Sequence, residues 1–134
     1  MIKYIRTQIV SAKPMSLGEF VKHSGFNPYA SNQKLCNNAK EGYIVEYEDG
    51  HISWSQKNDF EREYKVANTA LDRMNIEYYE LIDKYDKLVI FLVREDAISI
   101  AGKKQVDLMK IQKAQMYSYI CTLNKRIQLM KKDI

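Results

Sequence analysis

The stretch FEREYKVANTALDRMNIEYYELIDKYDKLVIFL, residues 60–92, decides the fold of this chain. Its apolar residues recur at alternating steps of three and four, the spacing that keeps one side of an α-helix apolar. The row consists of Phe60, Tyr64, Ala67, Leu71, Met74, Tyr78, Leu81, Tyr85, Leu88 and Leu92. The pattern predicts one long helix over about residues 56–96, with a seam for a second helix.

A second row with the same spacing follows Gly102. Its members are Met109, Gln112, Met116, Tyr119, Leu123, Arg126 and Met130. This row predicts a second helix over about residues 103–131. Because the apolar link between the two helices is short, the second helix must fold back on the first helix as an antiparallel hairpin. Gln112, Tyr119 and Arg126 stand where a coiled coil would have Leu. We interpret them as polar positions that face the partner helix.

The first part of the chain has the alternation and turn residues of a small sheet. Residues 1–10 read as a strand that Pro14 ends, and Ser16 with Glu19 has the spacing of a capping box for a short helix to about His23. Residues 24–40 are aperiodic and predict an irregular loop. Residues 41–47 and 51–54 predict two paired strands joined by a turn at Asp49-Gly50, and Ser55 is placed to cap the long helix.

These patterns predict an α+β fold, with a small antiparallel β module over residues 1–55 and a helical hairpin over residues 56–134. The hairpin also has apolar residues outside its two rows, so one partner helix cannot cover them all. They are Ile76, Ile82, Val89, Ile90, Leu108, Ile111, Ile120, Ile127 and Leu129. We therefore expect a homo-oligomer in which hairpins pack on other hairpins or on the sheet.

Enzyme and cofactor motifs are absent from the 134 residues. The glycines are scattered, there is no nucleophile elbow, and Cys36, Cys121, His23 and His51 lack metal-ligand spacing. We expect a reduced protein with no metal, no cofactor and no catalysis. No apolar stretch approaches the ~20 residues of a membrane span, and residues 1–10 are too polar for a signal peptide, so we expect a cytosolic protein without a membrane partner.

The charge is unevenly distributed. From Lys103 onward there are eight Lys and Arg residues against two Asp, a net charge of +6, whereas the first helix is acidic. Pairing of opposite charges across the hairpin explains part of this difference, and the remainder favours phosphate-bearing ligands. Nucleic acid is a poor fit, because Ile and Leu occupy helix faces that would have to be basic.

Arg126 is the first candidate for ligand binding, because a guanidinium at a seam position needs a counter-anion. It could meet a ligand phosphate, reach solvent at the helix end, or pair with Glu63 or Asp72. Gln112 could bind a ligand or form an amide bond between the helices, and Tyr119 could be plain core with a solvated hydroxyl.

Near the hairpin tip, Phe91 could stack on a base while Arg94 meets its phosphate, or Phe91 could be covered by a neighbouring subunit. Lys103 and Lys104 begin the second helix, where amides and basic side chains attract anions, although such a pair is commonly a solvated helix end. Trp54 is the remaining candidate, and it is more typical of a residue that anchors the sheet to the helix.

Two blocks of sequence resemble known families. The first resembles an N-terminal module common in phage proteins, and it comprises Ala12-Lys13-Pro14-Met15, Gly18-Glu19-Phe20, residues 41–47, Asp49-Gly50, Ser53-Trp54-Ser55 and Phe60. The second resembles the helical hairpin of phage sponges against the Thoeris and CBASS defence systems. It comprises Lys87-Leu88, Phe91, Gln105, Leu108-Met109, Gln112, Met116, Tyr119, Leu123 and Arg126-Ile127. In this order the blocks resemble the first type of Thoeris anti-defence protein.

The resemblance implies a non-catalytic dimer or larger oligomer in the cytoplasm of an infected bacterium. It implies that the protein sequesters cyclic ADP-ribose isomers, with cyclic oligonucleotides at a separate site in some relatives. By position, Phe91 would stack on the base, and Arg126 with its polar row would contact phosphate or ribose. The main rival to this interpretation is a helical protein-interaction module without a small-molecule ligand.

Overall fold

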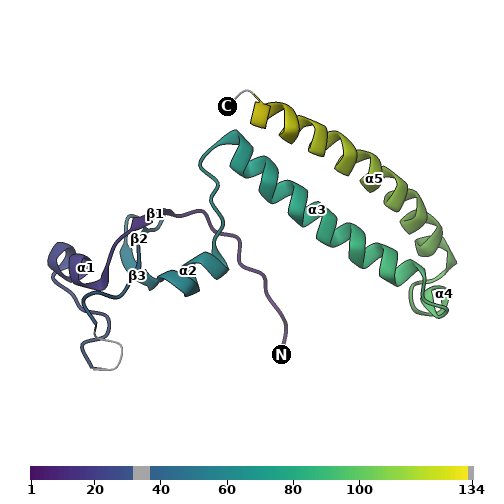
Figure 1. Ribbon diagram of the computed structural model, residues 1–134. Helices are drawn as coiled ribbons and strands as arrows, with labels where there is room; N and C mark the ends of the chain where they lie inside the picture. The colour runs from purple at the N-terminus through teal and green to yellow at the C-terminus, as the bar shows by residue number, and fades with distance from the viewer. Residues whose placement is uncertain (32–36, 133–134) are drawn as a thin grey trace. The chain divides into compact units, whose positions relative to one another are not determined.

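The computed structural model describes residues 1–31 and 37–132, which form two compact units, Met1–Lys65 and Val66–Ile134. The first unit contains a small sheet and two short helices, and the second contains the long helices (Figure 1). The predicted α+β class, with a small antiparallel sheet followed by a helical hairpin, is confirmed. Among the described residues, no helix combines the length and the apolar character that crossing a bilayer requires.

The first unit has the element order β1 (Ser11–Pro14), α1 (Leu17–Ser24), β2 (Gly42–Glu46), β3 (Ile52–Gln56) and α2 (Lys57–Glu63). Its strands form an antiparallel sheet in the order β1-β2-β3, in which Ala12 lies opposite Val45 and Ile44 opposite Trp54. The predicted β2–β3 hairpin is confirmed. Its turn uses a positive φ of 87° at Gly50, a conformation that glycine adopts without steric cost.

The core of the first unit forms around Trp54, which packs with Leu17 and Phe20 from α1. The indole N–H of Trp54 donates a hydrogen bond of 2.8 Å to the main-chain oxygen of Met15. A Cβ on Gly42 would lie only 2.3 Å from Cζ2 of Trp54, so this position requires glycine. The predicted start of α1 is also confirmed, because the Ser16 hydroxyl accepts from the backbone N–H of Glu19 at 3.2 Å. The other half of the predicted capping box is not formed, since the Glu19 carboxylate makes no hydrogen bond within the described residues.

The strand predicted over residues 1–10 is wrong. The N-terminal strand is Ser11–Pro14, and residues 1–10 have no regular secondary structure. The reason is the length of its neighbour. Ser11 lies opposite Glu46, the last residue of β2, so residues before Ser11 have no strand to pair with.

The single helix predicted over residues 56–96 is also wrong, because α2 ends at Glu63 and α3 begins at Ala70. Thr69 restarts the helix through a capping box. Its hydroxyl accepts from the N–H of Asp72 at 3.0 Å, and the Asp72 carboxylate accepts from the N–H of Thr69 at 3.0 Å. Ser55 is not the cap of α2, since Ser55 lies in β3 and α2 follows Gln56 without a side-chain cap.

The apolar residues before this break belong to the sheet unit. The ring of Phe60 stacks on that of Tyr43, with centroids 4.3 Å apart, and on that of Tyr64 at 4.8 Å. Phe60 and Tyr64 therefore continue the helical spacing in the sequence without belonging to the hairpin seam.

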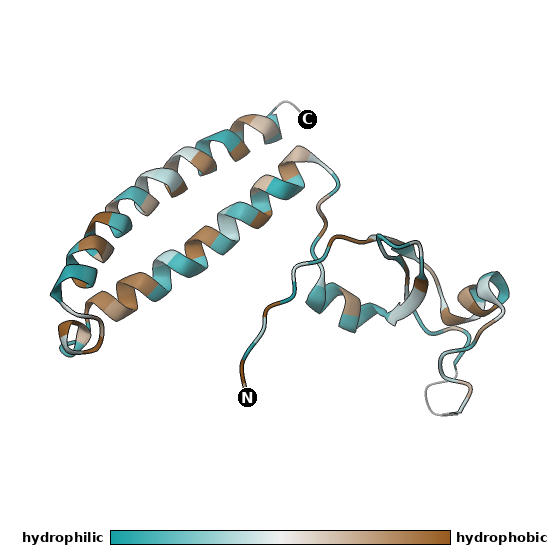
Figure 2. Ribbon diagram, turned by 180° about the vertical axis from the view of Figure 1, so that it is seen from behind, coloured by the Kyte–Doolittle hydropathy of each residue, from teal (hydrophilic) through white to brown (hydrophobic). Residues whose placement is uncertain are grey.

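The second unit consists of α3 (Ala70–Leu92), α4 (Ala97–Ala101) and α5 (Lys103–Lys132). Helices α3 and α5 lie side by side and run antiparallel, with α4 at the turn (Figures 1 and 2). Met74 of α3 is in a buried cluster with Leu123 and Ile127 of α5. Apolar residues recur along both helices in Figure 2, as expected for a hairpin held by one seam.

Candidate functional site

The seam residues of α3 are those that the sequence predicts. From Leu71 to Leu92, each member of the predicted row is buried or half-buried. They are Leu71, Met74, Tyr78, Leu81, Tyr85, Leu88 and Leu92. The alternating steps of three and four therefore place one continuous side of α3 against α5.

The seam of α5 differs from the predicted row at every second position. The residues of α5 that are buried or half-buried at alternating steps of three and four are Val106, Met109, Lys113, Met116, Ile120, Leu123, Ile127 and Met130. Gln112, Tyr119 and Arg126 are exposed, and each precedes a seam residue. The interpretation that these three side chains face α3 from within the seam is therefore wrong. One residue corresponds to a rotation of about 100°, which places them on the flank of the seam.

Helix α3 has a matching flank. The residues that precede Tyr78, Tyr85 and Leu92 are Glu77, Lys84 and Phe91. In an antiparallel helix pair, positions that precede the seam in this way on both helices lie on the same side. We call this side the hairpin flank, and it comprises Glu77, Lys84, Phe91, Gln112, Tyr119 and Arg126. Sequence reasoning missed Glu77 and Lys84, which the spacing of the α3 row could have identified.

The levels of these residues along the hairpin follow from two observed contacts. Met74 packs with Leu123 and Ile127, and the ring centroids of Tyr85 and Tyr117 lie 6.3 Å apart. Continuing this antiparallel alignment places Phe91 at about the level of Gln112. In the same way, the positions of Lys84 and Tyr119 correspond, and so do those of Glu77 and Arg126.

Arg126 is an available cation on the hairpin flank. It is exposed, and among residues 1–31 and 37–132 it makes no hydrogen bond or ion pair. The alternative that it pairs with Asp72 is not realised, because the Asp72 carboxylate instead accepts from the backbone of Thr69, and Glu63 belongs to the other compact unit. A free guanidinium presents several donors in a plane that matches a phosphate or a carboxylate.

The aromatic and amide groups of the flank are accessible as well. Tyr119 is 46% exposed, Phe91 is half-buried, and Gln112 is exposed without a hydrogen-bond partner in the described part of the chain. An amide offers both donors and acceptors for a hydroxylated ligand, and an aromatic face can stack on a base. The flank therefore combines a cation, an amide and two rings.

The cations near the tip are partly engaged. Arg94 lies beyond the end of α3, so it does not share a helical face with Phe91. Its Nε and Nη2 atoms each donate to the Asp96 carboxylate at 2.9 Å, and this hydrogen bonding lowers the pKa of Asp96. Lys103 donates to Asp107 at 2.9 Å and lowers the pKa of that carboxyl group. Lys104 is exposed and has no partner in the described residues.

Trp54 lies in the other compact unit, and its side chain is committed to the core there. It is 7% exposed, its N–H is bonded to Met15, and its ring meets the edge of Tyr29 at 5.8 Å between centroids. Trp54 therefore anchors the sheet to α1, the role that is more typical of such a residue, and it does not belong to the hairpin flank.

Groups suited to a metal ion are not found in residues 1–31 and 37–132. Cys121 is a free, half-buried thiol, and Cys36 lies outside the described residues. The Nδ1 atom of His51 lies 3.6 Å from Oδ1 of Asp49 at the β2–β3 turn, as expected for a hairpin turn.

One protein family matches most of the helical unit. Residues 68–129, from just before α3 to near the end of α5, match the family described as Sequestin. Neither curated proteins nor solved structures include a match to this chain. The Sequestin match fits a protein that sequesters a small molecule, and it favours a binding role over a catalytic one.

Proposed function

We propose that this chain is a phage anti-defence sponge, which binds a cyclic ADP-ribose-type signalling nucleotide and holds it without cleaving it. It would act in the cytoplasm of the infected bacterium and keep the messenger from its effector. The observation that carries the proposal is the Sequestin match over residues 68–129, on a hairpin whose flank exposes an unpaired Arg126. The resemblance of the two sequence blocks to the first type of Thoeris anti-defence protein supports the choice of ligand.

The chemistry of the hairpin flank suits such a ligand. Arg126 would donate paired hydrogen bonds to the pyrophosphate, and charge-assisted bonds of this kind are about twice as strong as neutral ones. Phe91 and Tyr119 would stack on the adenine, and Gln112 would bond to ribose hydroxyls. Lys104 adds an unpaired cation near the tip, whereas Arg94 and Lys103 would have to exchange a carboxylate partner for a phosphate.

Tight binding needs more than one hairpin, because the flank of a single chain is exposed and ligand sites enclose most of the ligand. The helical unit also exposes many large apolar side chains, as expected of a surface that another subunit covers. They are Val66, Tyr79, Ile90, Val93, Ile98, Ile100, Leu108, Ile111, Tyr117, Tyr119 and Leu129. A second hairpin packed on this surface would close the site, so the sponge would be a homo-oligomer.

The same exposed apolar surface favours one other function, a protein-interaction module that binds a foreign helix and no nucleotide. A cyclic oligonucleotide is a further candidate ligand. The two functions differ in what they require of Arg126, since packing against a foreign helix does not need a free guanidinium on the flank.

The test is calorimetric titration of the full chain with cyclic ADP-ribose isomers, with linear ADP-ribose and a cyclic dinucleotide for comparison. A ligand at about 100 times its Kd should add about 2.7 kcal/mol to the stability of the folded protein. Ligand recovered after denaturation should be chemically intact. Absence of binding to every nucleotide, or recovery of cleaved ligand, would contradict the proposal.

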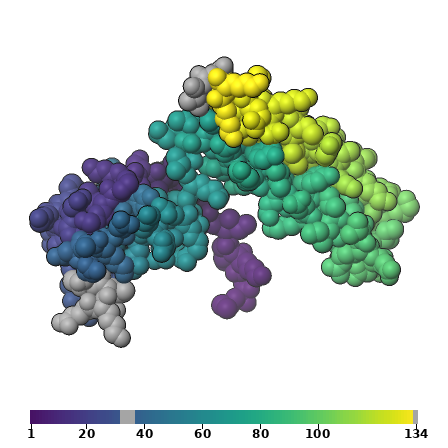
Figure 3. Space-filling model, in the orientation of Figure 1, coloured from purple at the N-terminus to yellow at the C-terminus, as the bar shows by residue number. Residues whose placement is uncertain are grey.

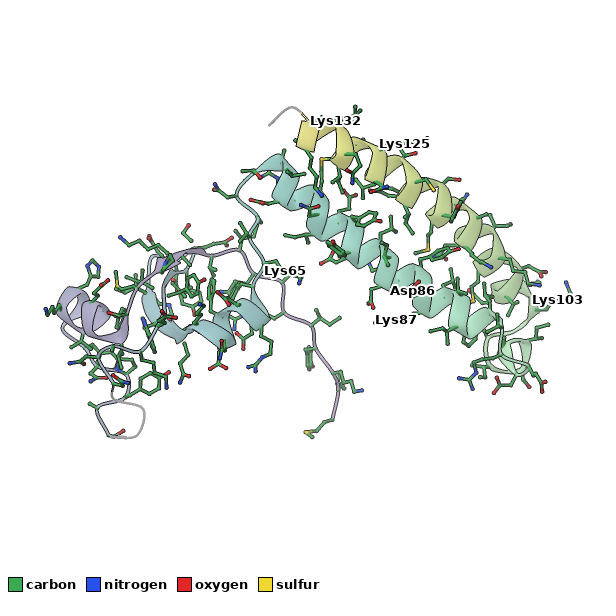
Figure 4. All side chains as sticks on the ribbon, viewed as in Figure 1. Lys65, Asp86, Lys87, Lys103, Lys125 and Lys132 are labelled. Carbon is green, nitrogen blue, oxygen red and sulfur yellow. The ribbon has the colours of Figure 1, made fainter. Side chains whose placement is uncertain are left out.

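Single substitutions test the site. Phe91→Ala and Arg126→Ala should each weaken binding at least about tenfold, the effect of losing ~1.4 kcal/mol, without changing the oligomeric state. Lys125→Ala is the matched control, because Lys125 is a neighbouring exposed cation on the side of α5 away from the seam (Figure 4). An equal loss of nucleotide affinity in the Arg126→Ala and Lys125→Ala variants would indicate a general effect of charge and not a binding site at Arg126.

A further inference from the structure

The first unit has an acidic hollow at one end of its sheet. It has a volume of about 390 Å³ and is lined by Pro14, Met15, Ser16, Glu19, Glu41, Gly42, Tyr43, Lys57 and Glu61. These residues come from the end of β1, the start of α1, the start of β2 and helix α2. Three carboxylates against one ammonium group give the hollow a net negative charge, and Pro14, Met15 and the ring of Tyr43 provide apolar surface.

The groups of the hollow are available to a cationic partner. The carboxylate of Glu19 has no hydrogen-bond or ion-pair partner within the described residues. The Glu41 carboxylate lies 3.5 Å from Nζ of Lys57, and the side chains of Glu41 and Lys57 are 77% and 49% exposed, respectively. Glu61 accepts from the Tyr43 hydroxyl at 2.8 Å, and a carboxylate has capacity for further donors. An incoming cation could therefore bind without breaking a short ion pair.

The same unit has an uncovered segment of opposite charge. Residues 1–7, which we call the arm, have no regular secondary structure and carry Lys3 and Arg6. The apolar side chains beside them are largely exposed, with exposed fractions of 78% for Ile2, 87% for Tyr4 and 94% for Ile5. Figure 3 shows this segment, in purple, standing clear of the sheet. Such a run of exposed apolar residues is typical of a segment that docks on another surface.

The arm and the hollow lie at opposite ends of β1. The arm precedes Ser11, where β1 begins, whereas the hollow includes Pro14 and Met15 at the other end. Gln8 is held in place, because its side-chain oxygen accepts from the hydroxyl of Tyr64 at 3.2 Å, beyond the far end of α2. The arm of one chain is therefore directed away from its own hollow.

We propose that the arm of one copy docks in the acidic hollow of another. Arg6 or Lys3 would lie among Glu19, Glu41 and Glu61, with its aliphatic stem on Pro14 and Met15 and its neighbouring apolar residues on the rim. This interface involves the sheet unit only, so it goes beyond the proposed nucleotide binding and does not depend on it.

Trp54 provides the readout for a binding experiment. It is the only Trp of the chain, and its ring lies directly behind Gly42 of the hollow. The probe is a peptide of residues 1–10, MIKYIRTQIV, which contains no Trp. The receiver is the full chain with Lys3→Gln and Arg6→Gln, whose own arm has no basic side chain to compete for the hollow. We expect a saturable change in Trp54 fluorescence.

Charge variants identify the groups involved. A Lys3→Gln, Arg6→Gln peptide should bind at least about tenfold more weakly, in line with the loss of charge-assisted hydrogen bonds. Glu61→Gln in the receiver should weaken binding about fivefold or more, whereas Glu63→Gln, on the same helix but outside the hollow, should stay within about twofold. Glu19→Gln is the second variant, because its carboxylate makes no contact that the fold needs.

Several outcomes would overturn the proposal. They are the absence of saturable binding, equal affinity of the neutral and the basic peptide, or an equal effect of Glu61→Gln and Glu63→Gln. A scrambled peptide that binds as tightly as the arm would show that the hollow accepts any basic segment, which would also overturn the assignment to a second copy. If the chain binds no nucleotide, the proposed sponge function fails but the arm–hollow interface is unaffected, because the peptide experiment needs no nucleotide.

Discussion

Arg126 and Ile127 are adjacent in α5 and lie in opposite environments. Ile127 is 3% exposed in the core of the hairpin, whereas Arg126 is exposed and makes no hydrogen bond or ion pair within the described part of the chain. The seam and the hairpin flank are therefore separated by one residue along the helix. Because of this separation, substitutions at neighbouring positions can test stability and ligand binding independently.

We expect Arg126→Ala to change the free energy of unfolding of the helical unit by no more than about 0.5 kcal/mol, as is usual for exposed positions. Ile127→Ala should destabilise the unit by about 2–5 kcal/mol, because it removes buried methyl groups and leaves a cavity. Denaturant unfolding followed by helical circular dichroism measures both values. A destabilisation of Arg126→Ala by 2 kcal/mol or more would mean that Arg126 belongs to the core and not to the flank.

The sequence predicted the α3 seam correctly because every position from Leu71 to Leu92 agrees with one apolar row. It misplaced half of the α5 seam for a physical reason. The observed row has Lys113, Ile120 and Ile127 where the predicted row has Gln112, Tyr119 and Arg126, so two of the three observed positions are strongly apolar and the charged Lys113 is the one that interrupts the observed row. The long stem of a lysine can cover apolar surface while its ammonium group reaches solvent.

The break between α2 and α3 was also missed, because helical spacing continues through Phe60 and Tyr64. Two local features outweighed that spacing, namely the capping box of Thr69 and Asp72 and the stacking of Phe60 on Tyr43. The second feature depends on where the sheet lies, which a periodic pattern does not contain. Likewise, the residues that α5 contributes to the flank could be placed there only after the seam of α5 was known, whereas Glu77 and Lys84 follow from the α3 row.

Lys113 gives a prediction about the seam. Replacing this half-buried lysine by Leu should stabilise the helical unit by about 1 kcal/mol, since a charged residue at a seam position costs stability and fixes register. Lys110→Leu, at an exposed position of the same helix, should have little effect. Unfolding midpoints measured side by side provide the comparison. Equal midpoints for both variants would show that the seam does not pass through Lys113.

Gly42 gives a prediction about the sheet unit. A Cβ at this position would lie 2.3 Å from both the Ser55 main-chain oxygen and Cζ2 of Trp54, so Gly42→Ala should destabilise the unit by about 1–3 kcal/mol or more. The near-ultraviolet circular dichroism and fluorescence of Trp54 measure this effect. Gly25→Ala is the control, because no atom would lie within 4 Å of its Cβ and only its φ of 71° is unfavourable. A larger loss of stability in Gly25→Ala than in Gly42→Ala would refute the close packing of Trp54 against Gly42.

Asp96 gives a prediction about pH. Hydrogen bonding from Arg94 lowers the pKa of Asp96 below its ordinary value of 3.8. A carboxyl group with a lowered pKa stabilises the folded state above its unfolded pKa, and this stabilisation is lost as the pH falls through the folded pKa. The helical unit should therefore lose the contribution of the Arg94–Asp96 pair only in acid, below about pH 4. Carboxyl NMR titration should show Asp96 with a lowered pKa, and Arg94→Ala should return it towards 3.8.

If a nucleotide phosphate binds Arg94 in place of Asp96, saturating ligand should raise the pKa of Asp96 in the native chain. An Asp96 pKa that ligand leaves unchanged would place the phosphate away from Arg94 and on the flank at Arg126.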